Sequence, residues 1–276
     1  SCALPPEQFA KLQKELPGEV FTTRTLATYS YELNNKKAPF DNVNVRKALN
    51  LSLDRNVITD KVLGQGQTPT YVFTPTYIEE GHLIQQPAYS KEPMAQRNEE
   101  AIKLLEEAGY SKANPLKFSI LYNTNENHKK VAIAAASMWK ANTKGLIDVK
   151  LENQEWKTYI DSRRAGRYDA ARAGWNADYN QATTFGNYFL SNSSNNTAKY
   201  ANPEYDKAIA ESYVATDAEG RAKAYAKAEE ILAKDFGIVP IFNYVNPRLV
   251  KPYVKGYSGK DPQDHIYLRN LYIIKH

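Results

Sequence analysis

Strand-like and helix-like segments alternate along the chain between residues 98 and 245. Short apolar runs such as LKFSILYN (116–123), IDVKLENQ (147–154) and GIVPIFNYV (237–245) are separated by longer segments with helical period. Asn202 followed by Pro203 is a typical helix start, with a cap and a first-turn proline. This alternation predicts an α/β fold, in which flanking helices cover a mixed sheet.

The pattern differs on either side of this block. Alternating residues at 20–35 predict a strand, and residues 41–66 predict two helices, the second capped by Asp54 and ended before Gly64. Residues 65–97 show no clear period and predict a long ordered loop, which is uncommon unless it is functional. The last 30 residues are irregular and rich in Tyr and Lys, which indicates a structural unit distinct from the α/β block.

Composition excludes several classes of protein. The net charge of +5 comes from lysines with glutamates beside them, as in EEAIKLLEEAGYSK, which is typical of solvated helix faces rather than of a nucleic-acid site. The single cysteine, Cys2, excludes an internal disulfide and a thiolate metal cluster. The four histidines lie far apart, so we expect no metal and no cofactor. No apolar run approaches the roughly 20 residues of a membrane span.

Catalytic signatures are absent from the sequence. It contains no G-x-S-x-G elbow, no H-E-x-x-H pair and no phosphate-binding P-loop. A hydrolase remains an alternative, because a carboxylate pair could hide among the 31 acidic residues. A non-enzymatic binding protein is the better-supported hypothesis, and 20 tyrosines suit a binding surface.

The stretch from Arg172 to Asp178 is the candidate binding site. Asp178 follows the predicted strand 168–175, at the end where open α/β sheets bind ligands, and its carboxylate could hold an ammonium group. Arg172 in the strand, Arg163 on the preceding helix and His128 are candidate partners for an anion at the other end of an extended ligand. The alternative is a plain surface ion pair between Arg172 and Asp178, and spacing alone favours it.

Four segments carry a resemblance to a known family. LENQEWKTYIDSR (151–163), DAARAGWNADYN (169–180), SNSSNNTAKY (191–200) and IVPIFNYVNPRLVKPYV (238–254) resemble the periplasmic oligopeptide-binding proteins of bacterial ABC importers, in solute-binding protein family 5. These relatives are considerably longer. The resemblance therefore implies the C-terminal half of a two-lobed periplasmic-binding-protein fold of class II, or cluster C. Residues 1–26 would end a first-lobe segment and form the hinge, 27–245 would form the second lobe, and 246–276 would return to the first lobe.

The resemblance also implies roles for single residues. Peptides are held in this family as an added strand, through main-chain hydrogen bonds. Asp178 resembles the carboxylate that binds the peptide α-amine, and Leu63 stands where relatives carry a lysine that contacts the peptide carboxylate, which bears on peptide length. The remaining implied roles are strand pairing by the main chain of Gly174, Trp175 and Asn176, carboxylate contacts by Arg163, Arg172 and His128, pocket walls from Trp156, Trp175 and Glu32, and a position at the hinge side of the cleft for Tyr244.

The same resemblance implies partners and a location. We expect an oligopeptide ligand, a membrane ABC permease, a missing N-terminal half of the same protein, and a periplasmic location with the leader absent from this chain. Haem, murein peptide or glutathione remain alternative ligands within the family, although an α-amine anchor at Asp178 argues against haem. No nucleic acid is expected.

Overall fold

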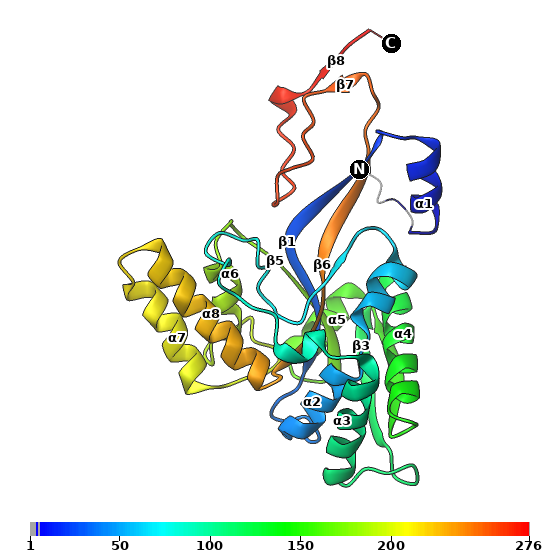
Figure 1. Ribbon diagram of the computed structural model, residues 1–276, viewed down its shortest axis with the longest axis vertical. Coiled ribbons are helices and arrows are strands. Elements are labelled where there is room, and N and C mark those ends of the chain that lie inside the picture. Colours follow the sequence, from blue (N-terminus) through cyan, green and yellow to red (C-terminus); the bar gives the residue numbers. More distant parts are fainter. Residues whose placement is uncertain (1–3, 5, 276) are drawn as a thin grey trace.

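The computed structural model describes Leu4 and residues 6–275, so Cys2 lies outside the described residues. One six-stranded sheet, in the order β2-β6-β1-β5-β3-β4, forms the centre of the molecule (Figure 1). Its strands are β1 (Val20–Leu33), β2 (Thr68–Pro69), β3 (Leu116–Asn123), β4 (Ile147–Gln154), β5 (Ala170–Asn176) and β6 (Ile238–Leu249). β1 is antiparallel to β5 and β6, whereas β3 is parallel to β4 and β5, which confirms the predicted mixed sheet.

Helices flank this sheet, as the sequence predicts (Figure 1). The α-helices are α1 (Pro6–Glu15), α2 (Val43–Leu51), α3 (Met94–Glu107), α4 (Glu126–Asn142), α5 (Trp156–Arg164), α6 (Thr183–Gly186), α7 (Pro203–Val214) and α8 (Ala218–Lys234). Shorter helical segments are the π-helix η1 (Val57–Leu63) and the 3-10 helices η2 (Ala88–Lys91), η3 (Asn187–Phe189) and η4 (Leu268–Asn270). In the part of the chain that the structure describes, no helix is both long and apolar enough to cross a bilayer.

The two larger apolar clusters of the lobe lie on opposite faces of β1. Successive side chains of a strand point to opposite faces. Tyr29 and Tyr31 pack on the face covered by α2 and α4, where the indole N–H of the fully buried Trp139 donates to the carbonyl of Leu49 at 2.9 Å. The other cluster joins α6, α7 and α8 around Phe185.

Local signals located several boundaries correctly. The side chain of Asn202 accepts from the N–H of Glu204 at 2.8 Å and caps α7, and Asp54 accepts from Val57 N–H at 3.3 Å before η1. Gly64 ends that helix in the left-handed conformation, at φ 62°. Residues 65–97 are largely irregular, as predicted, although α3 already begins at Met94. The short helices α6 and η3 were not predicted.

β1 and β6 continue together beyond the lobe as a two-stranded ribbon (Figure 1). Residues 20–24 of β1 pair with residues 245–249 of β6, and the register shifts between Arg24 and Thr28. At the end of this ribbon the chain forms a separate two-stranded sheet of β7 (Val254–Lys255) and β8 (Tyr272–Ile273). The small sheet of β7 and β8 therefore lies away from the α/β lobe (Figure 1).

Candidate functional site

A cavity of about 660 Å³ lies where β5, β6, the start of α4 and the C-terminal segment meet. Six of the predicted site residues line it, namely His128, Trp156, Arg172, Gly174, Asn176 and Tyr244. The structure thus brings together residues that the sequence separates by more than 100 positions. Pro262, Gln263 and Asp264 close one side of the cavity, and the carbonyl of Pro262 accepts from Leu26 N–H at 2.8 Å.

The cavity exposes an open strand edge. β5 pairs with β1 along its whole length, but β3 pairs only with Ala170 and Ala171 of β5. The N–H of Ala177 donates to Leu26, so in the antiparallel alternation the main-chain groups of Gly174 and Asn176 point away from β1. These two residues offer N–H and C=O groups to the cavity, as the edge of a sheet does for an added strand.

Arg172 supplies an uncompensated positive charge. Its guanidinium donates to the hydroxyl of Tyr244 and lies 5.2 Å from the centre of the Tyr29 ring. Among the described residues no carboxylate lies within ion-pair distance of Arg172, and the surface ion pair with Asp178 is not formed. A guanidinium remains protonated at any ordinary pH, so this cation is available to an anionic ligand.

His128 adds a neutral ring next to that cation. Its ring centre lies 5.5 Å from the centre of the Tyr29 ring, at the first turn of α4. Burial, followed by the nearby charge of Arg172, lowers the pKa of His128 from 6.5 to about 3. His128 therefore provides hydrogen bonding without charge, and Arg172 carries the positive charge of the cavity.

Asp178 lies just beyond the cavity, at the opposite end of the open edge from Arg172. It is exposed, and its neighbour Ala177 lines the cavity. The side-chain amide of Gln263 donates to the main-chain carbonyl of Asp178 at 3.4 Å. The Thr184 hydroxyl accepts a hydrogen bond from the N–H of Asp178 at 3.2 Å and donates one to Oδ2 of Asp178 at 3.4 Å. The open edge therefore has a cation near one end and a carboxylate near the other.

Arg163 and Glu32 do not line the cavity, unlike the sequence-based expectation. Arg163 Nη2 lies 2.9 Å from Glu32 Oε2 inside the lobe, with the hydroxyls of Tyr188 and Thr197 completing the cluster. The reason is the two-residue period of a strand. Glu32 pairs across the sheet with Ala171, so it shares the face of Ala171 and not that of Arg172.

The two tryptophans of the site are divided in the same way. Trp156 is 57% exposed and lines the cavity as predicted from the resemblance. Trp175 points to the opposite face of β5, where its ring lies 4.9 Å from that of Tyr188 and its indole N–H donates to Thr184 at 3.2 Å. The main chain of Trp175 pairs with Thr28 of β1, so the groups on the open edge come from its neighbours Gly174 and Asn176.

Several cavity residues were not predicted. Asn123 is nearly buried at the end of β3, and its Oδ1 has no hydrogen-bond partner among the described residues. The rule that ligands bind beyond the carboxyl ends of strands could have indicated it, since Asn123 ends a predicted strand. Thr25 and Gln263 also line the cavity, but they come from a strand irregularity and an irregular segment that carry no such signal.

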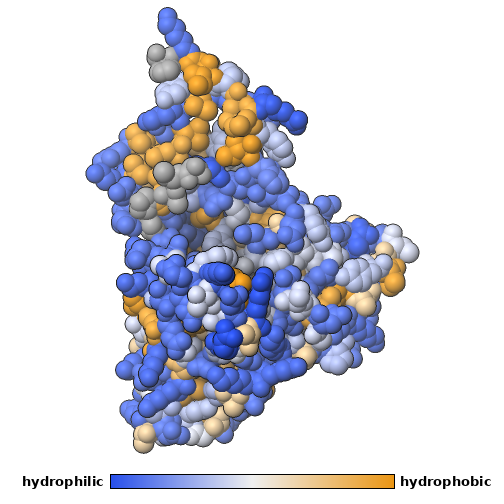
Figure 2. Space-filling model, turned by 180° about the vertical axis from the view of Figure 1, so that it is seen from behind, coloured by the Kyte–Doolittle hydropathy of each residue, from blue (hydrophilic) through white to orange (hydrophobic). Residues whose placement is uncertain are grey.

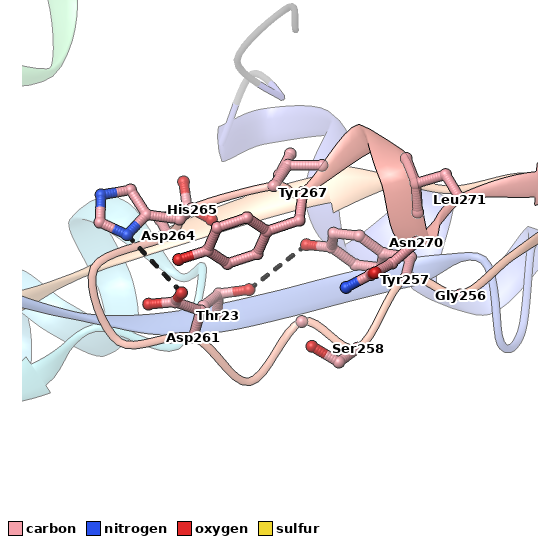
Figure 3. A pocket seen from close by; sticks show the side chains of 12 residues that line it. Thr23, Gly256, Tyr257, Ser258, Asp261, Asp264, His265, Tyr267, Asn270 and Leu271 are labelled. Atoms are coloured by element: carbon pink, nitrogen blue, oxygen red, sulfur yellow. Dashed lines mark hydrogen bonds and ion pairs between the residues drawn. The ribbon is translucent and has the colours of Figure 1, made fainter.

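Two other hollows lack this combination of groups. One of about 50 Å³ lies between Thr23 and the C-terminal segment (Figure 3), where the hydroxyls of Thr23 and Tyr257 are 3.4 Å apart and His265 lies 3.7 Å from Asp261. It is too small for a peptide. The other, of about 890 Å³, lies between α8 and the 83–92 segment and contains none of the predicted site residues. No described group of three His, Cys, Asp or Glu could hold a metal ion.

Comparison with protein families gives a match over most of the chain. Residues 1–197 match the model described as bacterial extracellular solute-binding proteins, family 5 Middle. The periplasmic oligopeptide-binding protein OppA of Haemophilus influenzae is 96% identical over 276 residues, which is 100% of this chain and 51% of that protein. OppA of Salmonella typhimurium is 55% identical over 273 residues, covering 99% of this chain and 50% of that protein.

Solved structures agree with the sequence comparison. The crystal structure of H. influenzae OppA in complex with the peptide RPPGFSPFR superimposes with a TM-score of 0.92, at 96% identity, over 99% of this chain and 53% of that chain. The murein tripeptide binding protein MppA of Escherichia coli gives a TM-score of 0.90 at 43% identity, over 99% and 53%. The chain thus spans about half the length of the relatives it matches, and it has the fold of one lobe of their two-lobed architecture.

Proposed function

The chain belongs to family 5 of the bacterial extracellular solute-binding proteins, and on this basis we propose that it forms the peptide-binding lobe of a periplasmic oligopeptide-binding protein. The complete protein would deliver peptides to a membrane ABC permease. The observation that carries this proposal is the open edge of β5, which faces a cavity of about 660 Å³ with opposite charges near its two ends.

An extended peptide fits this edge as an added strand. The main-chain groups of Gly174 and Asn176 would pair with the peptide backbone, with each hydrogen bond contributing about 0.5–1.5 kcal/mol. Such groups occur in every peptide, so this binding does not depend on the ligand's side chains. The Asp178 carboxylate would bind the α-ammonium group, and the Arg172 guanidinium would bind the terminal carboxylate.

The other site residues would have supporting parts. His128 would offer an uncharged hydrogen bond beside Arg172, and Tyr244 holds the guanidinium of Arg172 in place. Trp156 would form a wall for peptide side chains. Arg163 and Glu32 would support the sheet from its opposite face without touching the ligand.

A second polypeptide segment would complete the protein. Hydrophobic side chains gather at the end of the molecule that carries β7 and β8 (Figure 2), where Leu268 is 77% and Ile273 69% exposed. Exposed apolar surface of this kind is typical of an interface. We assign residues 1–26 to the end of a first-lobe segment and the hinge, 27–245 to the second lobe, and 246–276 to a return into the first lobe. An N-terminal half would cover the apolar surface.

The arrangement of charges favours a peptide over haem as the ligand. Haem is the ligand in the name of a relative, heme-binding protein A, that is 29% identical over 257 residues. Haem carries no ammonium group for Asp178 and no backbone to pair with β5. A peptide has both the ammonium group and the backbone. The murein peptide-binding relative, 43% identical over 274 residues, keeps a murein peptide as the alternative ligand within the same binding mode.

The test uses the two-lobed protein, meaning this chain fused behind the N-terminal half of its 96% identical relative. Calorimetry would compare a tripeptide with its N-acetylated and its C-amidated forms. We expect Asp178→Asn to remove the preference for a free amine, and Arg172→Met to remove the preference for a free carboxylate. Exposed Asp161 and Arg164, changed to Asn and Met, are the matched controls. Unchanged preferences in the two site variants would refute the proposal.

A further inference from the structure

The hydroxyl of Thr184 contacts three polar groups of β5 and of the segment that follows it. It accepts from the indole N–H of Trp175 at 3.2 Å and from the main-chain N–H of Asp178 at 3.2 Å. It also lies 3.4 Å from Oδ2 of Asp178, to which it donates. One side chain thus joins the far face of β5 to the carboxylate at the end of the open edge.

The numbers of donors and acceptors in a hydroxyl group determine where the hydrogen of Thr184 points. A hydroxyl has two acceptor lone pairs and one O–H donor. Both N–H groups are obligate donors, so Trp175 and Asp178 occupy the two lone pairs. The hydrogen then has the carboxylate of Asp178 as its acceptor, and the O–H direction is set by the other two bonds.

Thr184 is itself held firmly. It is 4% exposed, and Phe185 next to it is fully buried in the cluster formed with α7 and α8. Gly186 brings α6 against α7 so closely that an added Cβ would lie 2.7 Å from Cδ1 of Ile209. The hydroxyl therefore has little freedom to move away from Asp178.

Asp178, by contrast, is exposed and follows the end of β5. A side chain that is free in solution loses rotamer entropy when it binds a ligand, which weakens binding. A donor fixed at one carboxylate oxygen reduces that loss and leaves the other oxygen for a ligand.

From these contacts we infer that Thr184 is a positioning residue, which orients the Asp178 carboxylate toward the α-ammonium group of a bound peptide. This inference rests on the proposed function, since it takes Asp178 as the amine anchor. Trp175 contributes to this positioning, because its indole N–H occupies one lone pair of the Thr184 hydroxyl.

The experiment measures amine preference in the two-lobed protein, defined as the dissociation constant of an N-acetylated tripeptide divided by that of the free tripeptide. Thr184→Val keeps the shape of the side chain but removes the hydroxyl. We expect it to lower the amine preference about tenfold, the size of a hydrogen bond to a charged group. Thr184→Ser should restore the preference, because serine keeps the same hydroxyl.

Two further measurements separate positioning from folding. The preference for a free C-terminal carboxylate depends on Arg172, so it should be unchanged in Thr184→Val. Trp175→Phe replaces the indole by a single ring that has no N–H, which frees one lone pair of the Thr184 hydroxyl, and it should lower the amine preference by less than Thr184→Val does. It also serves as the second variant if Thr184→Val does not fold.

The outcomes distinguish this inference from the proposed function. If Asp178→Asn removes the amine preference and Thr184→Val leaves it intact, the role of Thr184 is refuted and the peptide site stands. If Thr184→Val weakens both terminal preferences equally, its role is structural only and the inference is refuted. If Asp178→Asn keeps the amine preference, the amine site fails and the inference fails with it.

Discussion

The Arg163 guanidinium and the Glu32 carboxylate form an ion pair of 2.9 Å inside the lobe, on the face of the sheet opposite to Arg172. Glu32 is 1% exposed, and its carboxylate also accepts from the hydroxyls of Tyr188 and Thr197. A charge buried in this way needs its partner, because water cannot solvate it once the partner is gone. The pair therefore stabilises the interior of the lobe.

We expect Arg163→Met in the two-lobed protein to lower the free energy of unfolding by about 3–5 kcal/mol, since it leaves Glu32 charged and unpaired in the interior. Urea unfolding would measure this loss. The double variant Arg163→Met with Glu32→Leu should recover part of it. Lys227→Met, which breaks the exposed pair with Glu211, is the matched control and should cost at most about 1 kcal/mol. An Arg163→Met protein as stable as this control would contradict the prediction.

Gly174 is required for the close approach of two cavity side chains. A Cβ at this position would lie 3.0 Å from Arg172 Nη2 and 3.0 Å from the hydroxyl oxygen of Tyr244. Gly174→Ala should displace both groups and weaken peptide binding by about tenfold, or roughly 1.4 kcal/mol. Calorimetry with one tripeptide would measure the change.

The double variant Gly174→Ala with Tyr244→Phe distinguishes steric displacement from other causes. Phenylalanine lacks the hydroxyl that the new methyl group would meet, so the double variant should bind more tightly than the product of the two single effects predicts. Additive effects would show that the methyl group acts by another route.

The histidine at position 128 should make stability depend on pH. Its pKa is about 3 in the folded protein, lowered by burial and by Arg172, against 6.5 for an unperturbed histidine. Between these values the unfolded chain binds more protons, so the free energy of unfolding falls as pH falls from about 6.5 toward 3. Below about pH 3 the loss of unfolding free energy that comes from His128 is complete.

Melting temperatures at pH 7 and pH 4.5 would test this point in His128→Gln and the unchanged two-lobed protein. The variant should lose less stability on acidification, because glutamine takes up no proton. His82→Gln, at an exposed histidine beside Glu219, is the control and should behave like the unchanged protein. Equal acid sensitivity in all three proteins would refute the assignment.

The chain by itself should bind peptides very weakly. It offers the open edge of β5, but it spans about half the length of its relatives, and we expect a second lobe to cover the other side of a peptide strand. Burial from both sides is needed to exclude water from the hydrogen bonds that hold the ligand. Calorimetry of the isolated 276 residues should show no binding at micromolar peptide, and micromolar affinity would contradict this expectation.

The sequence predicted the α/β lobe well because the lobe depends on local periodicity. The strands containing Tyr31, Phe118 and Ala171 and the cap at Asn202 all follow from neighbouring residues. The four-residue helix at 183–186 did not, since one turn carries too little periodicity to stand out in an Asn- and Ser-rich stretch.

The candidate site also contains residues that local sequence could indicate and residues that it could not. Arg172 was identified from one stretch and Gly174 and Asn176 from the family resemblance, and all three line the cavity. The burial of Glu32 could not be deduced from that stretch, because it depends on which face of β1 meets which face of β5. Gln263 reaches Asp178 from 85 positions away through an irregular segment, and no local pattern encodes such a contact.

The ribbon of β1 and β6 has a mechanical consequence. Its ladder of hydrogen bonds is interrupted between Arg24 and Thr28, and an irregularity of this kind bends a strand and increases its twist. Thr25 and Leu26 within that interruption also form part of the cavity wall. We therefore expect a ligand bound in the cavity to influence the angle between the ribbon and the lobe.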